Sequence, residues 1–319
     1  MRLDILIIIL YFVLGLVALY FGGEGLVSGA SNLARMLGIS PMVIGLTVVA
    51  FGTSSPEFLV SIMAAFRGSS DIVIGNIVGS NISNIALILG VSAILCPIII
   101  HIKLIRIEVP IMIFLSLLLY ALAWGLRIGR LEGGILFTAL IAFIVYSYYA
   151  ARKGSYKAEA GFEEIKKNGG YLKQTVFLIL GLVGLIIGAR LLVNSAITIA
   201  QLFGVSEFVI GITAVAIGTS LPELSTSIVA ALRKEQDIIV GNIIGSNIFN
   251  IGILGLVSVI RPIKVEPSLL RFEFPVLIFF TVLVLPLMKT GFRLSKVEGL
   301  VLLLLYAVFI YLLFNPIWL

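Results

Sequence analysis

The chain contains one segment twice. Residues 43–84 align without gaps on residues 209–250, at an offset of 166 positions, and 26 of the 42 aligned residues are identical. The identities include glycine, threonine, serine, proline, glutamate and asparagine in register, which chance similarity between apolar helices does not produce. A repeat of this kind indicates that the chain is built from two copies of one structural unit.

Ten apolar runs divide the chain, each long enough to cross a hydrocarbon core about 30 Å thick as a helix. Only helices or closed barrels span lipid, and continuous apolar runs without strict alternation favour helices. The composition agrees, because 60% of the residues are hydrophobic and 12% are charged, whereas a soluble domain carries about 25% charged residues. We therefore predict an all-α membrane protein with ten transmembrane helices, near residues 5–33, 41–66, 71–95, 105–126, 132–151, 173–203, 207–232, 237–260, 272–288 and 296–315.

The ten expected helices form two groups of five around the only sizeable polar stretch of the chain. We predict a first five-helix repeat over residues 1–151, a linker loop over 152–172 and a second repeat over 173–319. Because five is odd, the second copy enters the membrane in the opposite sense. Such an inverted repeat is typical of alternating-access transporters, and a cation channel built on the same spans is the alternative. The first run is interpreted as a retained span and not as a signal peptide.

The basic residues are distributed unequally between the two sides of the membrane. The five odd-numbered loops hold 14 Lys and Arg residues, the opposite side holds 7, and Arg190 lies inside a span. By the positive-inside rule, the linker loop is cytoplasmic and both termini are extracellular in a multi-pass protein of the cell membrane. This topology explains the net charge of +6 without a nucleic-acid partner.

Glu57 and Glu223 occupy equivalent positions in the middle of the second and seventh runs. A charged side chain at the centre of a bilayer costs about 2.5 kcal/mol or more and is functional by default. Pro56 and Pro222 stand directly before them, and each proline frees a backbone carbonyl within the membrane, where only a cavity or a ligand accommodates it. We expect two cation-binding carboxylates, and we predict that the second, third, seventh and eighth helices are broken.

The third and eighth runs carry the related segments GNIVGSNISN and GNIIGSNIFN. Their glycines allow close helix approach, and four of their residues add neutral oxygens: Ser80, Asn84, Ser246 and Asn250. Four further asparagines are either interhelical hydrogen-bonding groups or supports of the ligands: Asn76, Asn81, Asn242 and Asn247.

The expected site contains only oxygen ligands, which hard cations such as Ca²⁺ and Na⁺ prefer. The single histidine, His101, lies at the end of a run, and Cys96 is assigned to packing. Two carboxylates balance one Ca²⁺, whereas three Na⁺ leave an excess of one positive charge, so an exchange of these ions is electrogenic. An enzyme is disfavoured, because the sequence has no Ser/His or paired Asp arrangement and its acidic pair is symmetric.

The motifs GTSSPE…GNIVGSN and GTSLPE…GNIIGSN resemble the two alpha-repeats of the cation/calcium exchanger superfamily, in particular those of prokaryotic sodium/calcium exchangers, over all ten spans. The resemblance implies alternating access, in which the first and sixth helices slide across a fixed core. It implies Ca²⁺ binding by Glu57, Glu223 and the carbonyls of Thr53 and Thr219. It also implies one Na⁺ position at Ala50, Thr53, Ser54, Glu57 and Ser80, a second at Ala216, Thr219, Ser220, Glu223 and Ser246, and a middle position at Asn84 and Asn250.

Asn250 is a departure from the resemblance, because the archaeal exchangers that this sequence resembles have an aspartate at the corresponding position. An amide resembles a protonated carboxyl in shape and lacks charge, so the balance of two carboxylates survives. The sequence predicts a Na⁺/Ca²⁺ antiporter with no cofactor beyond the transported ions, and an H⁺/Ca²⁺ exchanger of the same superfamily is the alternative. Glu24 and Arg190 are also equivalent in the repeat, and they either form a salt bridge or extend separately to the membrane surface.

Overall fold

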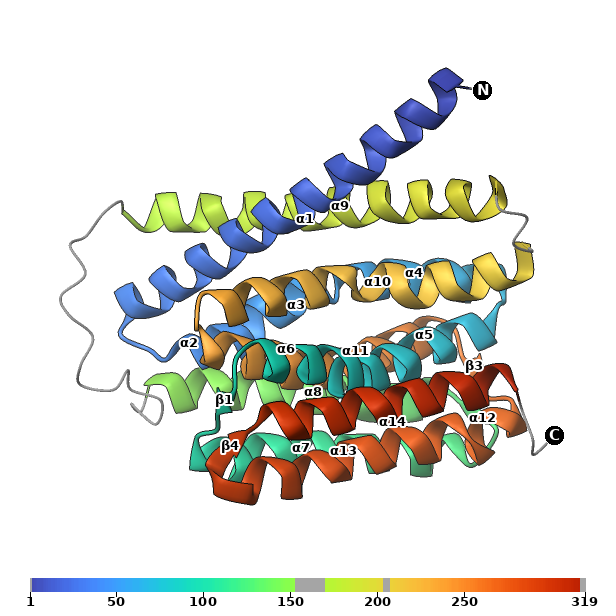
Figure 1. The fold of residues 1–319 in the computed structure, drawn as a ribbon. Helices are drawn as coiled ribbons and strands as arrows, with labels where there is room; N and C mark the ends of the chain where they lie inside the picture. The colour runs from blue at the N-terminus through green and yellow to red at the C-terminus, as the bar shows by residue number, and fades with distance from the viewer. Residues whose placement is uncertain (1, 153–169, 203–206, 316–319) are drawn as a thin grey trace.

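The computed structural model describes residues 2–152, 170–202 and 207–315, most of which are helical (Figure 1). Within these residues, eight helical segments are long and apolar enough to cross a membrane, or nine if the bent pair Pro41–Thr53 and Ser55–Arg67 counts as one span. The seventh expected span falls on α10 (Glu207–Leu232). The side chains at the beginning of α10 are not among those that the structure describes. The helical membrane fold is therefore confirmed, while the number ten stays a prediction.

The first half of the chain is a series of helices joined by short connections. Its elements are α1 (Arg2–Leu37), α2 (Pro41–Ile44), the π-helical segment η1 (Gly45–Val49), α3 (Ala50–Thr53), α4 (Ser55–Arg67), α5 (Ser70–Ser83), the π-helical η2 (Asn84–Ile88), α6 (Leu89–Leu95), β1 (Ile98–Ile99), the π-helical η3 (Leu104–Glu108), α7 (Val109–Ala123), β2 (Arg127–Ile128) and α8 (Arg130–Arg152).

The second half has fewer interruptions. After α9 (Tyr171–Leu202) and α10 come α11 (Gln236–Ile260), β3 (Ile263–Lys264), α12 (Pro267–Arg271), α13 (Glu273–Lys289), the 3₁₀ turn η4 (Thr290–Phe292), β4 (Arg293–Leu294) and α14 (Lys296–Phe314).

Local sequence signals mark several helix ends. Pro41 begins α2, and the hydroxyl of Ser40 accepts a hydrogen bond of 3.2 Å from the backbone N–H of Met42, which satisfies one of the free donors of the first turn. Gly68 ends α4 with φ of 81°, a conformation that glycine adopts without steric cost. The cap at Ser40 and the glycine at position 68 therefore explain where α2 begins and where α4 ends.

The second expected helix is broken, as predicted. Its two parts, Pro41–Thr53 and Ser55–Arg67, meet at an angle of 41°. Pro56 follows this bend and has no N–H to donate, while the hydroxyl of Ser55 donates to the carbonyl of Phe51 at 2.9 Å. The bend places Ser54 and Glu57 at the inner face of the helix.

The predicted breaks in the third, seventh and eighth helices are wrong. The third span runs from Ser70 to Leu95 with η2 inside it, α10 continues through Pro222, and α11 is unbroken. The reason is packing, because 83% of the residues in the most apolar 18-residue stretch of α11 are buried. Each glycine costs only about 1 kcal/mol of helix stability, which is too little to break such a helix. Pro222 removes one backbone hydrogen bond from α10. The remaining hydrogen bonds of this 26-residue helix keep it continuous on both sides of the proline.

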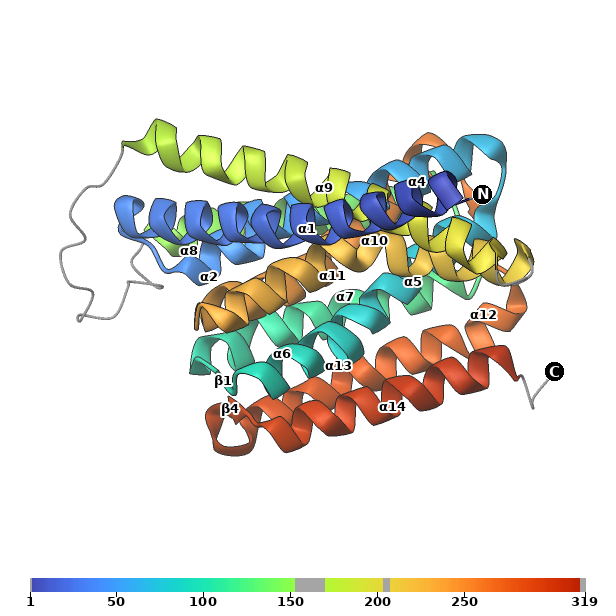
Figure 2. The same cartoon turned by 45° about the horizontal axis from the view of Figure 1, so that its top comes forward.

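Three groups of helices form layers. Figure 1 shows α1 and α9 together on one side, α5 and α11 in the middle, and α13 and α14 on the far side, and Figure 2 shows the same grouping after rotation. Almost every residue of α11 between Ile238 and Ser258 is buried, so α11 is the centre of the core. In contrast, only 22% of the residues in the most apolar 18-residue stretch of α1 are buried.

α1 and α9 pack antiparallel with their backbones in contact. A methyl group on Gly22 would lie 2.7 Å from the backbone N of Leu185, and one on Gly181 would lie 2.3 Å from that of Leu26. Comparable contacts recur seven residues before and after Gly22 on α1, at Gly15 and Gly29, and seven residues after Gly181 on α9, at Gly188. Small residues of this kind allow close helix approach in a membrane, and they join α1 and α9 into one pair.

Two short antiparallel ladders tie the halves of the chain together. β1 pairs with β4, through Ile98 with Leu294, and β2 pairs with β3, through Ile128 with Ile263. In Figure 1, β1 and β4 lie at one end of the helices and β3 lies at the other. Each end of the structure therefore has one short ladder that joins the first half of the chain to the second.

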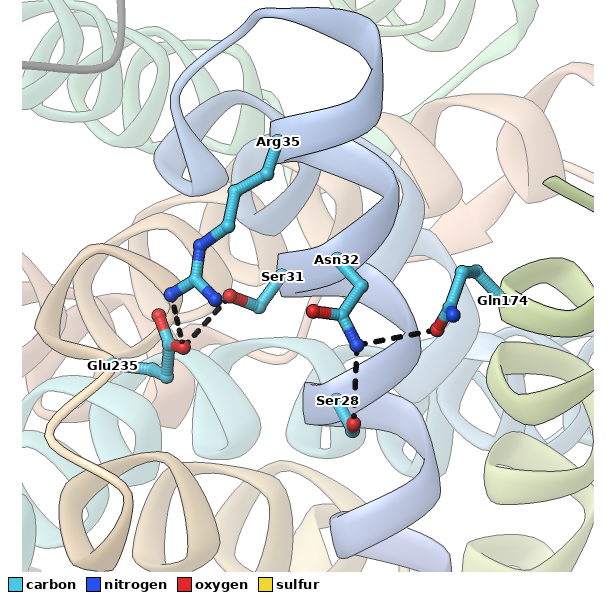
Figure 3. A network of polar contacts seen from close by, with 6 residues as sticks. All are labelled: Ser28, Ser31, Asn32, Arg35, Gln174 and Glu235. Carbon is cyan, nitrogen blue, oxygen red and sulfur yellow. Dashed lines mark hydrogen bonds and ion pairs between the residues drawn. The ribbon is translucent and has the colours of Figure 1, made fainter. Parts of the chain in front are cut away.

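A polar network holds the end of α1 on the β1–β4 side (Figure 3). The guanidinium of Arg35 and the hydroxyl of Ser31 both donate to Oε1 of Glu235 at 2.7 Å. Asn32 donates to Gln174 of α9 at 3.2 Å. These contacts connect α1 to α9 and to the connection between α10 and α11.

Glu24 does not pair with its repeat equivalent. Its carboxylate forms an ion pair with Arg233, at the end of α10, while Arg190 is exposed on α9. α1 and α9 are neighbours, but in their antiparallel pairing Glu24 and Arg190 do not come together.

Candidate cation-binding site

Two carboxylates lie at the buried centre of the structure. Glu57 is in the first turn of α4 and is 0% exposed, and Glu223 follows Pro222 in α10 and is 1% exposed. Oε1 of Glu57 accepts a hydrogen bond of 3.4 Å from Ser80 of α5, and Oε1 of Glu223 accepts one of 3.2 Å from Ser54. Ser54 stands three residues before Glu57, so its contact with Glu223 brings the two carboxylates to one centre. Like charges buried together require a compensating positive charge or a proton.

Each carboxylate retains a free oxygen. Oε2 of Glu57 and Oε2 of Glu223 are both buried without a hydrogen-bond partner among the described residues. Buried carboxylate oxygens normally have partners, because an unpaired one loses its hydration without compensation. Two such oxygens at one centre have the chemistry of ligands for a cation.

Two threonine hydroxyls join the halves of the chain. Thr53 donates to Oδ1 of Asn242 at 3.1 Å, and Thr219 donates to Oδ1 of Asn76 at 3.2 Å. The two contacts are equivalent in the repeat: Thr219 is the counterpart of Thr53, and Asn76 is the counterpart of Asn242, at the offset of 166 residues. Each threonine hydroxyl therefore contacts an asparagine of the other copy.

Asn76 also holds the helix that carries Glu57. Its amide nitrogen donates to the carbonyl of Glu57 at 3.1 Å and to the hydroxyl of Ser61 at 3.0 Å. Asn76 and Asn242 therefore form interhelical hydrogen bonds, one of the two roles considered for them. Ser61 was not expected at the site, and its only sequence signal is its identity with Ser227 across the repeat.

The predicted neutral ligands gather around the same centre. Ser80 and Ser246 are buried on α5 and α11, and Ser220 donates to Ser80 at 3.4 Å. Asn84 and Asn250 are 1% and 0% exposed. Both polar atoms of the Asn84 amide, and Oδ1 of Asn250, are buried without a partner within the described part of the chain.

A close approach of α11 positions the remaining predicted residues. A methyl group on Gly245 would lie 2.6 Å from the carbonyl of Leu46 and 2.7 Å from Cβ of Ala50, so only glycine allows α11 to lie this near the broken span. Ala50 is fully buried, and its carbonyl accepts a hydrogen bond of 3.4 Å from Thr53. Ala216 belongs to α10, and its side chain lies outside the described residues.

The site is not a conventional metal centre. Among the residues that the structure describes, no group of three or more His, Cys, Asp and Glu side chains comes together. His101 is at the end of the helices, where it contacts Asp237 at 3.0 Å. The oxygens of two carboxylates, hydroxyls, amides and carbonyls suit hard cations with flexible coordination.

The fold and its buried polar centre define a helical membrane protein of the transporter class. The chain belongs to the sodium/calcium exchanger family, whose model, described as sodium/calcium exchanger protein, matches residues 7–149 and 173–315. The two matched stretches fall within the two repeats predicted from the sequence, residues 1–151 and 173–319. Members of this family are cation exchangers and not enzymes, so the chain is a membrane protein for cation and calcium exchange.

Similar proteins cover nearly the whole chain. The sodium/calcium exchanger MaX1 of Methanosarcina acetivorans is 36% identical over 342 residues, which span 96% of this chain and 98% of the relative. The inner membrane protein YrbG of Escherichia coli is 35% identical over 277 residues, or 85% of each chain. A solved structure of the sodium-calcium exchanger NCX_Mj, soaked with 10 mM Na⁺ and zero Ca²⁺, has a TM-score of 0.83 and 35% identity over 96% of this chain and 99% of that chain.

Proposed function

We propose that this protein is a secondary antiporter that exchanges Na⁺ for Ca²⁺ across the cell membrane by alternating access. The observation that carries the proposal is the pair of buried carboxylates, each with one oxygen free of hydrogen bonds among the described residues. In the absence of a bound cation, two such charges at the centre of a membrane protein are costly. Similarity to proteins named sodium/calcium exchangers supports Na⁺ as the counter-ion.

Ca²⁺ binds to the two free carboxylate oxygens and to the carbonyls of Thr53 and Thr219. The hydrogen bonds of both threonine hydroxyls to asparagines across the repeat support this assignment, because they fix the threonines on either side of the carboxylates. Na⁺ occupies two positions related by the repeat and a middle position. The first uses Ala50, Thr53, Ser54, Glu57 and Ser80, the second uses Ala216, Thr219, Ser220, Glu223 and Ser246, and the middle one uses Asn84 and Asn250.

Three Na⁺ ions in place of one Ca²⁺ make the exchange electrogenic, because the two carboxylates balance only two positive charges. No further cofactor takes part.

The architecture is two inverted five-helix repeats, residues 1–151 and 173–319, joined by the loop 152–172. Paired contacts support the inversion: β2 corresponds to β4 at the offset of 166 residues and β1 to β3 at an offset of 165, and the ladders β1–β4 and β2–β3 lie at opposite ends. The beginning of α1 and the end of α14 lie at the same end in both views (Figures 1 and 2), as an even number of spans requires. With α10 as the seventh span, that number is ten.

The β1–β4 end faces the cytoplasm and the opposite end, with both termini, faces outward. The cytoplasmic assignment rests on the greater number of Lys and Arg residues in the odd-numbered loops. The network of Arg35 and Glu235 belongs to this end (Figure 3). Alternating access then requires that the α1–α9 pair slides across the core and opens one end at a time.

A flux experiment distinguishes this function from its alternatives. Purified protein in liposomes loaded with Na⁺ is expected to take up ⁴⁵Ca²⁺ against its gradient, and replacement of internal Na⁺ by choline is expected to stop uptake. Uptake that continues in choline and follows a pH gradient would identify an H⁺/Ca²⁺ exchanger. Flux that does not saturate and cannot drive a counter-ion uphill would identify a channel.

A further inference from the structure

Asn81 and Asn250 are linked by a hydrogen bond across the repeat. The amide nitrogen of Asn250 donates to Oδ1 of Asn81 at 3.0 Å, and the amide nitrogen of Asn81 donates to the backbone carbonyl of Asn247 at 3.2 Å. All three residues are buried at the level of the site. Asn81 is not a ligand in the cation site proposed above, so its side chain has a different role.

The orientation of both amides follows from the backbone carbonyl. A carbonyl only accepts hydrogen bonds, so the group that Asn81 turns toward Asn247 is its NH₂ group. Its Oδ1 then faces Asn250, and this oxygen in turn accepts only from an NH₂ group. Asn250 therefore turns its NH₂ group toward Asn81 and its Oδ1 away, and this Oδ1 is buried without a partner in the described chain.

The orientation matters because an amide has two unlike ends. Its oxygen is a ligand for Na⁺, whereas its NH₂ group carries partial positive charge and repels a cation. An amide at position 250 that is free to rotate presents the oxygen for only part of the time. A fixed amide presents it always.

We propose that Asn81 is a positioning residue that makes Asn250 an oxygen ligand for Na⁺ at the middle position. This inference rests on the proposed exchange function and adds a residue that sets its Na⁺ affinity. It also explains how the neutral Asn250 supplies a ligand oxygen without a carboxylate.

The repeat provides a matched control at Asn247, the equivalent of Asn81. Its amide nitrogen donates to the carbonyl of Ile243 on its own helix at 2.7 Å, and its Oδ1 has no partner among the described residues. Both amide atoms of Asn84, the equivalent of Asn250, are also without partners there. The orienting contact is thus present on one side of the repeat only, and the same substitution is expected to have unequal effects at Asn81 and Asn247.

The test compares the Asn81→Ala and Asn247→Ala proteins in liposomes, by the Na⁺ concentration that gives half-maximal Na⁺-driven ⁴⁵Ca²⁺ flux. Loss of a group that orients a metal ligand lowers metal affinity about 10- to 100-fold. We expect Asn81→Ala to raise the half-maximal Na⁺ concentration about 10-fold, with little change in the half-maximal Ca²⁺ concentration. We expect Asn247→Ala to change neither strongly.

A double-mutant cycle separates orientation from general support of the core. The two oxygens of an aspartate are equivalent, so in the Asn250→Asp background no orienting contact is needed, and at alkaline pH the added Asn81→Ala substitution is expected to cost no Na⁺ affinity. A structural role for Asn81 would produce the same loss in both backgrounds. Asn81→Ser, which is too short to span both contacts, replaces Asn81→Ala if the alanine variant does not elute as a folded protein.

The outcomes are distinct. A rise in half-maximal Na⁺ concentration that is confined to Asn81 and lost in the Asn250→Asp background supports the proposal. Equal effects of Asn81→Ala and Asn247→Ala, or an equal loss in both backgrounds, would overturn it. Absence of Na⁺-driven flux in the wild-type protein would instead refute the proposed function.

Discussion

Ser54 of the first copy donates a hydrogen bond of 3.2 Å to Oε1 of Glu223 in the second copy. Ser54 is the residue at the bend between α3 and α4, three positions before Glu57. The bend of one copy therefore holds the carboxylate of the other. A single centre built from both halves is what an exchanger needs if one set of charges is to bind either Ca²⁺ or Na⁺.

Substitution of Ser54 tests this contact, and the next residue is a control. Ser54→Ala leaves Oε1 of a buried carboxylate without its donor, and hydrogen bonds to charged groups contribute about 1.5–3 kcal/mol. We expect at least a roughly 10-fold loss of apparent Ca²⁺ affinity in liposome uptake, since about 1.4 kcal/mol corresponds to tenfold. The hydroxyl of Ser55 donates to the carbonyl of Phe51 on the exposed side, so Ser55→Ala is expected to change affinity little. Equal effects of the two substitutions would contradict the contact.

Asn250→Asp is expected to make exchange depend on pH. The residue at this position faces Oδ1 of Asn81, which accepts a hydrogen bond from a protonated aspartate but repels an ionised one. Initial rates of Na⁺-driven ⁴⁵Ca²⁺ uptake are therefore expected to match the wild type at acidic pH and to diverge from it as the pH rises. A pH profile identical to that of the wild type would count against a middle site at Asn250.

Adjacent glycines of α8 test the helix packing. A methyl group on Gly133 would lie 2.6 Å from the carbonyl of Gly255 in α11, whereas one on Gly134 would meet no atom within 4 Å. Overpacking of this kind costs about 1–3 kcal/mol, so Gly133→Ala is expected to lower the melting temperature in detergent by several degrees. Gly134→Ala is expected to leave it unchanged or to raise it slightly, since alanine favours helix. A lower melting temperature for Gly134→Ala alone would refute this packing.

Cysteine labelling tests the orientation in the membrane. In a Cys96→Ser background, Arg127→Cys lies in the β2–β3 ladder and Lys289→Cys lies beside the β1–β4 ladder. A membrane-impermeant maleimide added to intact cells is expected to modify position 127 and to reach position 289 only after permeabilisation. The reverse pattern would show that the termini are cytoplasmic.

Much of the fold follows from the sequence because bilayer thickness and hydrogen bonding allow few alternatives. The helical membrane class and the burial of Glu57 and Glu223 both rest on this constraint. The helix breaks were predicted less well, because proline and glycine weaken a helix locally but packing decides whether it bends. Ser55 differs from Leu221 at the equivalent position, and the helix is interrupted beside Ser55, whereas α10 continues through Leu221.

The contacts between copies were not predictable from one sequence. The repeat identifies Thr53 and Asn242 as residues of interest, but it does not say that they touch, since that depends on which helices pack together. Glu24 illustrates the same limit, because its repeat equivalent is Arg190 and its partner in the structure is Arg233. The orientation of Asn250 depends in turn on a backbone carbonyl that no motif contains.

The central claim is that two buried carboxylates carry Ca²⁺ in exchange for Na⁺, and charge removal tests it most directly. Each of Glu57→Gln and Glu223→Gln removes half of the negative charge that replaces the hydration of the ion, while Glu266→Gln changes an exposed glutamate outside the site. The measurement is the initial rate of ⁴⁵Ca²⁺ uptake into Na⁺-loaded liposomes that contain equal amounts of each folded protein. We predict that both site variants fall to the rate of protein-free liposomes and that Glu266→Gln keeps the wild-type rate. Near-normal uptake by Glu57→Gln and Glu223→Gln would contradict the account.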